Sequence, residues 1–204
     1  MITIIDYGVG NINAFYNIYK NLGIVVKIAK SSKELVGASK LILPGVGHFD
    51  YAMTKFKDSG MINNVTEMVL NSNIPILGIC VGMQMLAQSS EEGVLPGLGW
   101  VDGEVKKINS SLLQQTTRLP HMGWNDINVT KQTPLFGGLE SSSLFYFLHS
   151  YYFKCHNNHD IISTSFYGEN FTSSVNYLNI YGVQFHPEKS HRNGIKLLEN
   201  FAKL

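Results

Sequence analysis

The chain is poor in several residues and patterns that mark common protein classes. It holds two cysteines, Cys80 and Cys155, which are too few for a disulfide framework and favour a reducing compartment. Charged residues make up 15% of the chain and the formal net charge is +1, without a basic stripe, so nucleic acid is not an expected partner. The histidines and cysteines show no zinc-ligand spacing, neither H-x-x-x-H nor C-x-x-C, and we expect no metal and no cofactor.

Long apolar segments are also missing. No run approaches the length of a membrane-spanning helix, so we expect no membrane association. The residues from Met1 to Asp6 reach an acidic side chain before any basic region or long apolar stretch, and we expect no secretion signal. With 44% apolar residues the chain can bury a sizeable core. These features predict a cytoplasmic protein with a single domain over residues 1–204.

The first half of the chain alternates short apolar strands with helical patterns. We expect strands at 2–5, 24–29, 40–43 and 74–79 and helices at 11–22, 31–38, 49–57, 61–70 and 81–88. This alternation is typical of parallel strands joined by right-handed crossovers. In the resulting sheet the loops at 6–11 and 44–49 and residue Cys80 all follow strands, so we expect them at one edge, where ligands bind in such folds.

The second half changes character from Trp100 onward, where β-branched and aromatic residues predominate. We expect strands, several of them antiparallel, at 101–108, 124–129, 144–148, 151–155, 161–166, 172–177 and 180–185. A final amphipathic helix at 192–203 places Ile195, Leu198 and Phe201 on one face. The sequence therefore predicts an α/β fold with a largely parallel central sheet flanked by helices and additional antiparallel strands in the second half.

Cys80 stands where an apolar strand meets a helical pattern, between Gly78 and Gly82. This is the layout of a nucleophile elbow, with cysteine in the place of serine. The glycines leave room for a tight turn that lifts the sulfur clear of the backbone, and the dipole of the following helix favours the thiolate. A buried, unreactive cysteine is the alternative that this segment alone leaves open.

His186 and Glu188 offer a base and a group to orient it, since they follow the apolar run that ends at Phe185. Side chains two residues apart in an extended segment point to the same side, so the carboxylate can accept the imidazole N–H and fix its tautomer. A strand-terminal histidine beside a solvated glutamate is the competing interpretation. The joint presence of an elbow cysteine favours the catalytic one.

Other residues qualify for supporting roles. The N–H of Val81 and the glycine-flanked Val46 are candidate donors to an oxyanion, and Gln84 lies one turn beyond Cys80, on the same helix face. His48 and Cys155 are more typical of structural positions. A dinucleotide-binding loop at Gly8-Val9-Gly10 is rejected because its third glycine is absent.

Taken together, these motifs resemble a known family. The stretches 78–84 (GICVGMQ) and 182–190 (GVQFHPEKS) resemble the class I, triad-type glutamine amidotransferases and, within them, the glutaminase subunits of imidazole glycerol phosphate synthases. Supporting stretches are 5–11 (IDYGVGN), 43–49 (LPGVGHF), 119–125 (LPHMGWN) and 147–151 (FLHSY), so the resemblance covers nearly the whole chain. Val81 stands where leucine is usual, in a position that needs only its backbone.

The resemblance implies a class I glutamine amidotransferase fold and a set of roles. Cys80 would attack the side-chain amide of glutamine, His186 would move the proton to the leaving ammonia, and Glu188 would orient His186. The implied oxyanion donors are Val46 and Val81.

Other residues implied by the resemblance surround these groups. Gly47 and Gln84 would line the glutamine pocket, and the backbone of Ser150 and Tyr151 would hold the α-amino acid end of the substrate. The residues implied at the partner interface are Asn11, Trp124 and Tyr146, although a core Trp124 is the competing account.

The implied partner is a cyclase subunit with a (β/α)8-barrel fold, joined in a heterodimer, which receives the ammonia for histidine biosynthesis. Three alternatives stay open at this point. The same chemistry can serve a paralogous partner that builds amidino sugars of surface polysaccharides. A non-catalytic flavodoxin-like binding module and a cysteine peptidase or γ-glutamyl hydrolase are the others.

Overall fold

The computed structural model describes residues 1–113, 118–140 and 143–204 of the chain. Its strands are β1 (Ile2–Ile5), β2 (Val26–Ala29), β3 (Lys40–Gly45), β4 (Ile76–Cys80), β5 (Ser89–Ser90), β6 (Gly103–Lys107), β7 (His121–Asp126), β8 (Asn128–Val129), β9 (Leu144–His149), β10 (Tyr151–Cys155), β11 (Ile161–Tyr167), β12 (Glu169–Tyr177) and β13 (Ile180–Val183). Its α-helices are α1 (Ile12–Asn21), α2 (Phe49–Asp58), α3 (Ile62–Thr66), α4 (Val81–Gln84) and α5 (His191–Lys203).

Shorter turns connect these elements. A π-helical turn, η2 (Glu67–Asn71), continues α3, and 3-10 turns form η1 (Ser32–Leu35), η3 (Ser110–Leu112), η4 (Pro134–Phe136), η5 (Asn158–Asp160) and η6 (Pro187–Lys189).

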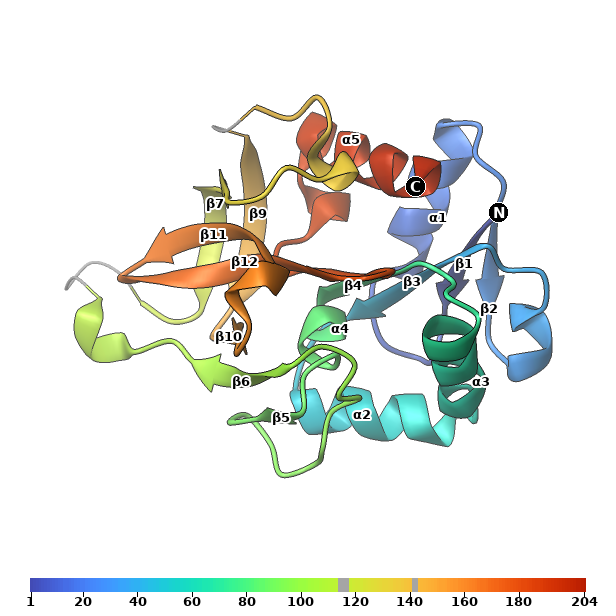
Figure 1. Cartoon of the computed structure of the whole chain (residues 1–204), viewed down its shortest axis with the longest axis horizontal. Helices are drawn as coiled ribbons and strands as arrows, with labels where there is room; N and C mark the ends of the chain where they lie inside the picture. The colour runs from blue at the N-terminus through green and yellow to red at the C-terminus, as the bar shows by residue number, and fades with distance from the viewer. Residues whose placement is uncertain (114–117, 141–142) are drawn as a thin grey trace.

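A long twisted sheet runs through the molecule in the spatial order β2-β1-β3-β4-β13-β12-β10-β6-β5 (Figure 1). The strands from β2 to β13 pair in parallel, and β12 then pairs antiparallel with β13 and β10. Strands β7 and β9 form a separate antiparallel ribbon. The predicted fold class, a largely parallel sheet with antiparallel strands added by the second half, is therefore confirmed.

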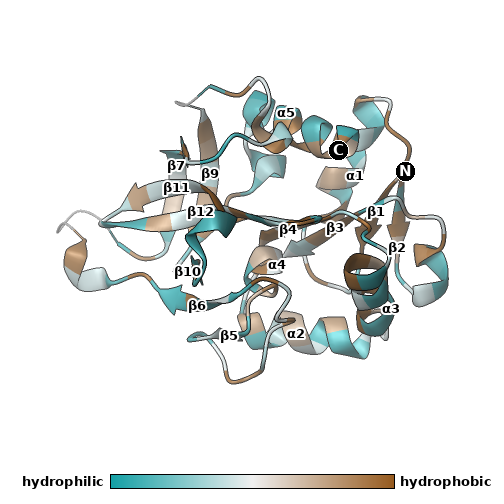
Figure 2. Cartoon of the chain, viewed as in Figure 1, coloured by the Kyte–Doolittle hydropathy of each residue, from teal (hydrophilic) through white to brown (hydrophobic). Residues whose placement is uncertain are grey.

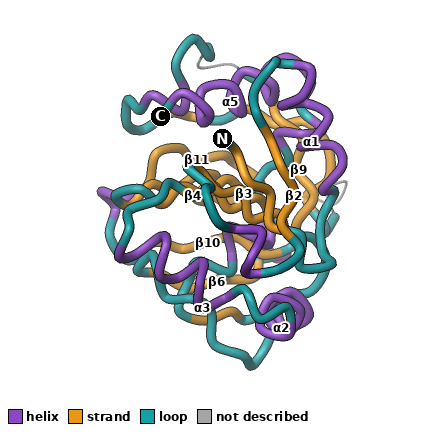
Figure 3. The backbone as a smooth tube through the Cα atoms, turned by 90° about the vertical axis from the view of Figure 1, so that its right-hand side faces the viewer, coloured by secondary structure: helices purple, strands orange, loops and turns teal. Residues whose placement is uncertain are grey.

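Helices cover both faces of the sheet, with α1 and α5 on one side and α2 and α3 on the other (Figures 1 and 3). Every residue of β1 and β4 is buried, and the hydrophobic colour in Figure 2 gathers on these strands between the helix layers. Burying each aliphatic side chain of this kind contributes about 1.5–3 kcal/mol. The core therefore holds the carboxyl ends of β1, β3 and β4 rigidly beside one another.

The predicted meeting of three loops at one sheet edge is confirmed. The Tyr7 hydroxyl, after β1, donates a hydrogen bond of 2.6 Å to the Pro44 carbonyl at the end of β3. Gly45, the last residue of β3, pairs with Cys80 at the end of β4. The edge is therefore built from segments that are far apart in the sequence.

Several predicted boundaries are wrong for identifiable reasons. Strand β3 continues through Pro44 instead of stopping before it. The residues of β3 that pair with β1 end before Pro44, so the missing N–H of this proline leaves no hydrogen bond to β1 unmade. The helix expected at 81–88 is a single turn, Val81–Gln84. On α5, Leu198 and Phe201 are buried as expected, but Ile195 is 39% exposed.

Candidate active site

Cys80 occupies a strained turn between β4 and α4. Its backbone has φ 54° and ψ −113°, a conformation that residues other than glycine rarely adopt. Holding such a residue costs of order 1–3 kcal/mol, and this kind of strain concentrates at functional sites. The turn has the strand–cysteine–helix form that the sequence predicts for a nucleophile elbow.

The glycines around Cys80 are required by close backbone packing. A Cβ atom on Gly82 would lie 2.0 Å from the Leu43 carbonyl oxygen, and one on Gly78 would lie 2.6 Å from the Gly82 carbonyl oxygen. A Cβ on Gly45 would come within 2.2 Å of the Gly82 nitrogen. Strands β3 and β4 can therefore press against α4 only because these three residues lack side chains.

The helix-dipole argument for the thiolate is weakened by the shape of α4. The helix spans only Val81–Gln84, so its dipole is much smaller than that of the helix expected at 81–88. The charge of the sulfur must instead be balanced by groups that approach it from other elements.

His186 supplies that balance, and Glu188 holds it in place. The Nδ1 atom of His186 lies 2.9 Å from Oε1 of Glu188, and both side chains are almost fully buried. A carboxylate oxygen accepts, so Nδ1 carries a proton and Nε2 is the nitrogen left for other partners. The predicted extended segment is wrong here, because Pro187–Lys189 form a 3-10 turn that folds Glu188 back beside His186.

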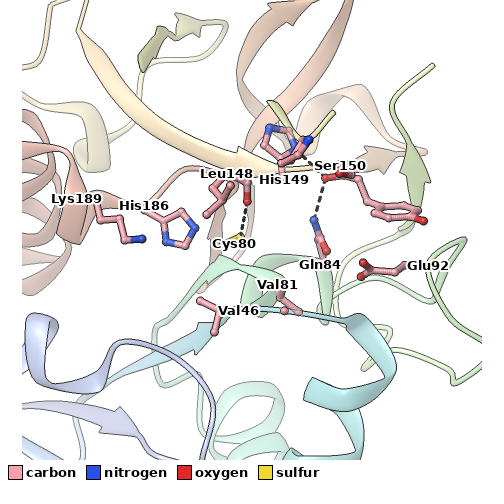
Figure 4. Close-up of a pocket in the computed structure, with 13 residues that line it drawn as sticks. Val46, Cys80, Val81, Gln84, Glu92, Leu148, His149, Ser150, His186 and Lys189 are labelled. Carbon is pink, nitrogen blue, oxygen red and sulfur yellow. Dashed lines mark hydrogen bonds between the residues drawn. The ribbon is translucent and has the colours of Figure 1, made fainter. Parts of the chain in front are cut away.

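Cys80 and His186 line the same pocket, and Figure 4 shows both side chains directed into it. Burial acts to lower the pKa of His186, but the nearby Cys80, followed by Glu188, acts to raise it, and on balance the pKa is raised from 6.5 to about 10. The pocket thus brings together a cysteine and an imidazole whose second nitrogen is fixed by a carboxylate, which are the groups that an activated cysteine nucleophile needs.

The pocket has a volume of about 390 Å³, enough for a ligand of amino-acid size. Its lining brings together all six residues that the sequence suggests for substrate and oxyanion binding, and adds others, among them Glu92 and Lys189. The lining residues are Val46, Gly47, Cys80, Val81, Gln84, Glu92, Pro120, Leu148, His149, Ser150, Tyr151, His186 and Lys189.

The two candidate oxyanion donors approach the pocket from different elements. Val81 is the first residue of α4, where a backbone N–H has no acceptor within its own helix. Val46 follows β3, is 41% exposed, and precedes Gly47, whose φ of +84° suits glycine. A peptide in such a segment can rotate without opposition from a side chain on the next residue.

Gln84 is buried and tied to the structure through its amide nitrogen. Nε2 donates to the Tyr151 carbonyl at 2.9 Å and to Oε1 of Gln184 at 3.0 Å. Gln184 in turn directs its own Nε2 at the Cys80 sulfur, 3.7 Å away. No local motif predicts Gln184 as a site residue, since only the sheet pairing of β13 with β4 brings it beside Cys80.

Ser150 and Tyr151 form the far wall of the pocket, at the step from β9 to β10. The Ser150 carbonyl accepts from the Ile108 N–H at 3.0 Å, and the Tyr151 carbonyl accepts from Gln84. Their carbonyls are thus engaged within the protein.

Glu92 is a second residue that the sequence analysis missed. Its Oε2 accepts from the Phe49 N–H at 2.9 Å, which places a carboxylate at the pocket wall. The loop that carries it is pinned by Asp50, whose carboxylate accepts from the N–H groups of Val94 and Leu95. A negative charge here complements the ammonium group of an amino acid, and nothing in the local sequence distinguishes Glu92 from its neighbour Glu91.

The three residues suggested for a partner interface lie at exposed or half-buried positions. Trp124 is 46% exposed and pairs across the β7–β9 ribbon with Tyr146, their ring centroids 6.1 Å apart. The Tyr146 carbonyl accepts the backbone N–H of His186 at 2.8 Å, which links this ribbon to the His186 segment. Asn11 is exposed at the start of α1, a helix that packs against η6.

His48 and Cys155 have structural positions. The Nδ1 atom of His48 accepts from the Asp50 N–H and caps α2. Burial raises the pKa of the Cys155 thiol to about 12, so this cysteine is not an activated one. Within the described ranges no three His, Cys, Asp or Glu side chains are grouped to hold a metal ion. None of the described helices has the length and hydrophobicity needed to cross a membrane.

Comparisons with known proteins agree with this geometry. Residues 3–204 match the family model described as glutamine amidotransferase class-I. Over its full length the chain is 51% identical to imidazole glycerol phosphate synthase subunit HisH of Leptospira borgpetersenii and 52% identical to the subunit of the same name from Bdellovibrio bacteriovorus, with each relative also covered completely.

Solved structures show the same fold at lower identity. PurLQS from Thermotoga maritima superposes with a TM-score of 0.75 at 17% identity, covering 99% of this chain and 97% of the other. A glutamine amidotransferase from Thermotoga maritima gives a TM-score of 0.65 at 18% identity, covering 99% and 82%, respectively.

Proposed function

Because this chain belongs to the class I glutamine amidotransferases and, within them, to the HisH subunits of imidazole glycerol phosphate synthase, we propose that it hydrolyses glutamine and delivers the ammonia to a cyclase subunit in histidine biosynthesis. The observation that carries the proposal is the strained Cys80 turn beside the buried His186–Glu188 pair in one pocket of amino-acid size.

The proposed reaction begins with the Cys80 thiolate, which forms a bond to the carbon of the side-chain amide of glutamine. The amide oxygen becomes an oxyanion and is held by the N–H groups of Val46 and Val81. As the C–N bond breaks, the proton on Nε2 of His186 moves to the nitrogen and ammonia leaves. Glu188 keeps Nδ1 protonated and stabilises the imidazolium at the start of the step.

Water completes the cycle. Nε2 of His186, now neutral, takes a proton from water as the oxygen adds to the thioester carbon. The C–S bond then breaks and returns the thiolate and glutamate. Gly47 and Gln84 line the side-chain end of the pocket in this scheme, and Ser150 and Tyr151 hold the α-amino acid end. Glu92 adds a counter-charge for the α-ammonium group, in accordance with its place in the pocket wall.

The proposed partner is a cyclase with a (β/α)8-barrel fold, bound as a heterodimer through a surface that includes Asn11, Trp124 and Tyr146. There the ammonia reacts with a phosphoribulosyl intermediate to give imidazole glycerol phosphate and an aminoimidazole ribonucleotide. A flip of the peptide at Val46, made easy by Gly47, would complete the oxyanion hole when the cyclase carries its ligand. The chain would act as one glutaminase domain in the cytoplasm, where its thiols stay reduced.

The test is a glutaminase assay of the chain alone, with the cyclase, and with the cyclase plus its phosphoribulosyl ligand. We expect ammonia release to be strongly stimulated in the third mixture. Cys80→Ala should abolish it while the complex still forms and still turns over with free ammonia. Glutaminase activity that the histidine-pathway cyclase fails to stimulate would indicate a paralogous partner. No glutamine hydrolysis in any mixture would refute the proposal.

A further inference from the structure

Two buried histidines adjoin the pocket, with His149 in its lining, and take no part in the proposed chemistry. His121, the first residue of β7, pairs across the ribbon with His149, the last residue of β9. Their rings are joined by a contact of 2.9 Å from Nδ1 of His121 to Nε2 of His149. Nδ1 of His149 lies 2.8 Å from the Tyr151 carbonyl oxygen. We refer to His121 and His149 as the histidine pair.

These hydrogen bonds form a series from His121 through His149 to the Tyr151 carbonyl, and the carbonyl at its end fixes the direction of each bond. A carbonyl oxygen only accepts, so Nδ1 of His149 must carry the proton. In a neutral imidazole Nε2 is then an acceptor, and Nδ1 of His121 must donate to it. Nε2 of His121 is left as an acceptor and faces the amide nitrogen of Asn125 at 3.3 Å. One arrangement of protons thus satisfies every hydrogen bond in this series.

The surroundings of the histidine pair favour the neutral rings that this arrangement needs. His121 stacks between Phe147 and Tyr167 at centroid distances of 4.8 and 4.0 Å, and Phe171 lies 5.1 Å from His149. Burial lowers the pKa of His121 to about 4.

The groups that face His149 act in the same direction. Burial, and after it His121, lower the pKa of His149 to about 3; the bond to the Tyr151 carbonyl opposes them, and His186 adds a smaller lowering. Both rings therefore stay uncharged at neutral pH, while His186, which lines the same pocket as His149, holds its proton.

The bond from His149 to Tyr151 closes a short loop over Ser150, the residue between them. The Tyr151 carbonyl also accepts a hydrogen bond from the amide nitrogen of Gln84. Two buried side chains, Gln84 and His149, therefore fix the direction of this carbonyl. A fixed Tyr151 carbonyl restrains the peptide groups of Ser150 and Tyr151, which form the far wall of the pocket.

From this geometry we infer that the histidine pair positions the substrate-binding backbone: His121 locks His149 as the Nδ1–H tautomer, and His149 holds the Ser150–Tyr151 peptides in the orientation that binds the α-amino acid end of the substrate. The inference rests on the proposed glutaminase function for the identity of that substrate. The pair acts through Tyr151 and does not touch the reacting atoms, so its members are positioning residues.

The hydrogen-bond direction can be measured without reference to activity. Long-range ¹H–¹⁵N correlation spectra of the full chain should show His149 with a protonated Nδ1 and an unprotonated Nε2, and neither ring of the pair should titrate between about pH 5 and 9. Replacing His121 by phenylalanine removes the donor to Nε2, and the His149 tautomer should then become mixed. Protonated Nε2 on His149 in the wild-type chain would overturn the inference, whatever the enzyme kinetics show.

Two substitutions at one position then separate positioning from simple packing. In His149→Asn the amide nitrogen stands where Nδ1 stood and can still donate to Tyr151, whereas in His149→Gln the amide reaches past that carbonyl. His149→Asn leaves His121 without its acceptor, whereas His149→Gln can present Oε1 in place of Nε2, so His149→Gln should be the more stable variant and a rise in its KM cannot be assigned to misfolding. In the complex with the cyclase and its ligand, we expect KM for glutamine to rise about tenfold in His149→Gln and to stay within about threefold of wild type in His149→Asn, with kcat little changed in both.

The exposed His159, replaced by glutamine, is the matched control and should behave as wild type. Equal KM values in the two His149 variants would contradict the inference, as would a fall in kcat without a change in KM. If neither variant folds, the wild-type spectra still decide. If the wild-type complex releases no ammonia, the proposed function fails, and the spectra report separately whether the pair has the inferred direction.

Discussion

Replacing Cys80 by alanine should lower the pKa of His186. In the wild-type chain burial opposes the charged imidazole, but Cys80, which is a thiolate in the proposed mechanism, and Glu188 outweigh it and raise the pKa from 6.5 to about 10. Alanine removes the thiolate and leaves only Glu188 to oppose burial. An opposite charge at contact range is worth about 1–3 pH units, so we expect the pKa of His186 to fall by that amount.

The raised pKa of His186 also predicts how the stability of the fold depends on pH. A pKa that is higher in the folded chain than in the unfolded chain stabilises the fold fully below about pH 6.5, and this contribution is lost as the pH rises through about 10. At about 1.4 kcal/mol for each factor of ten in proton affinity, the contribution is roughly 5 kcal/mol. His186 is 3% exposed, so solvent screens little of it. In Cys80→Ala the loss of stability should begin at a lower pH.

Two measurements follow the effect: the ring nitrogens of His186 by NMR from pH 5 to 10.5, and the free energy of unfolding over the same range. Cys155→Ala is the matched control, because the pKa of Cys155 is raised to about 12 and its thiol carries no charge over most of this range. It should leave the titration of His186 unchanged. An identical titration of His186 in wild type and Cys80→Ala would refute the thiolate–imidazolium pair.

Three further predictions concern other parts of the site. Gly82→Ala should lower stability by about 2 kcal/mol or more, measured by denaturant unfolding, because its Cβ would lie 2.0 Å from the Leu43 carbonyl oxygen; an unchanged unfolding midpoint would count against the close packing. Glu188→Gln should lower glutamine-dependent kcat by about 10²-fold or more, and ammonia-dependent turnover of the complex should not change; a loss of both activities would indicate misfolding instead. Trp124→Ala should weaken stimulation by the cyclase, seen in titrations of glutaminase activity with the partner, whereas the equally exposed Tyr51→Ala on α2 should not; equal behaviour of the two variants would remove Trp124 from the interface.

Sequence patterns predicted the parallel half of the fold well, because its strands are buried on both sides and appear as unbroken apolar runs, as in β1 and β4. The predicted strand and helix boundaries were wrong where tertiary contacts outweighed the local conformational preference of the residues. Pro44 is accommodated in β3 only because β1 has already ended beside it. The helix expected after Cys80 stops at Gln84, and the carbonyls of the next three residues accept instead from N–H groups of the segment 98–101.

The candidate site residues also divide into those that a local motif predicts and those that only tertiary contacts reveal. Cys80 and His186 could be identified because each follows a strand in a distinctive local motif. Glu92, Gln184 and the histidine pair could not, because their neighbours come from distant segments and their local sequences are ordinary. The contact of Gln184 with Cys80, for example, depends on the parallel pairing of β13 with β4, which no short pattern reveals.

The most direct test of the proposed chemistry is to find the atom that attacks glutamine. A diazoketone analogue of glutamine alkylates an activated nucleophile with loss of N₂, and peptide mass spectrometry of the labelled complex then locates the adduct. We expect one adduct, on Cys80, which forms in step with the loss of glutaminase activity and is absent from Cys80→Ala. Inactivation with the adduct on Cys155 or any other residue, and none on Cys80, would contradict the assignment of Cys80 as the nucleophile.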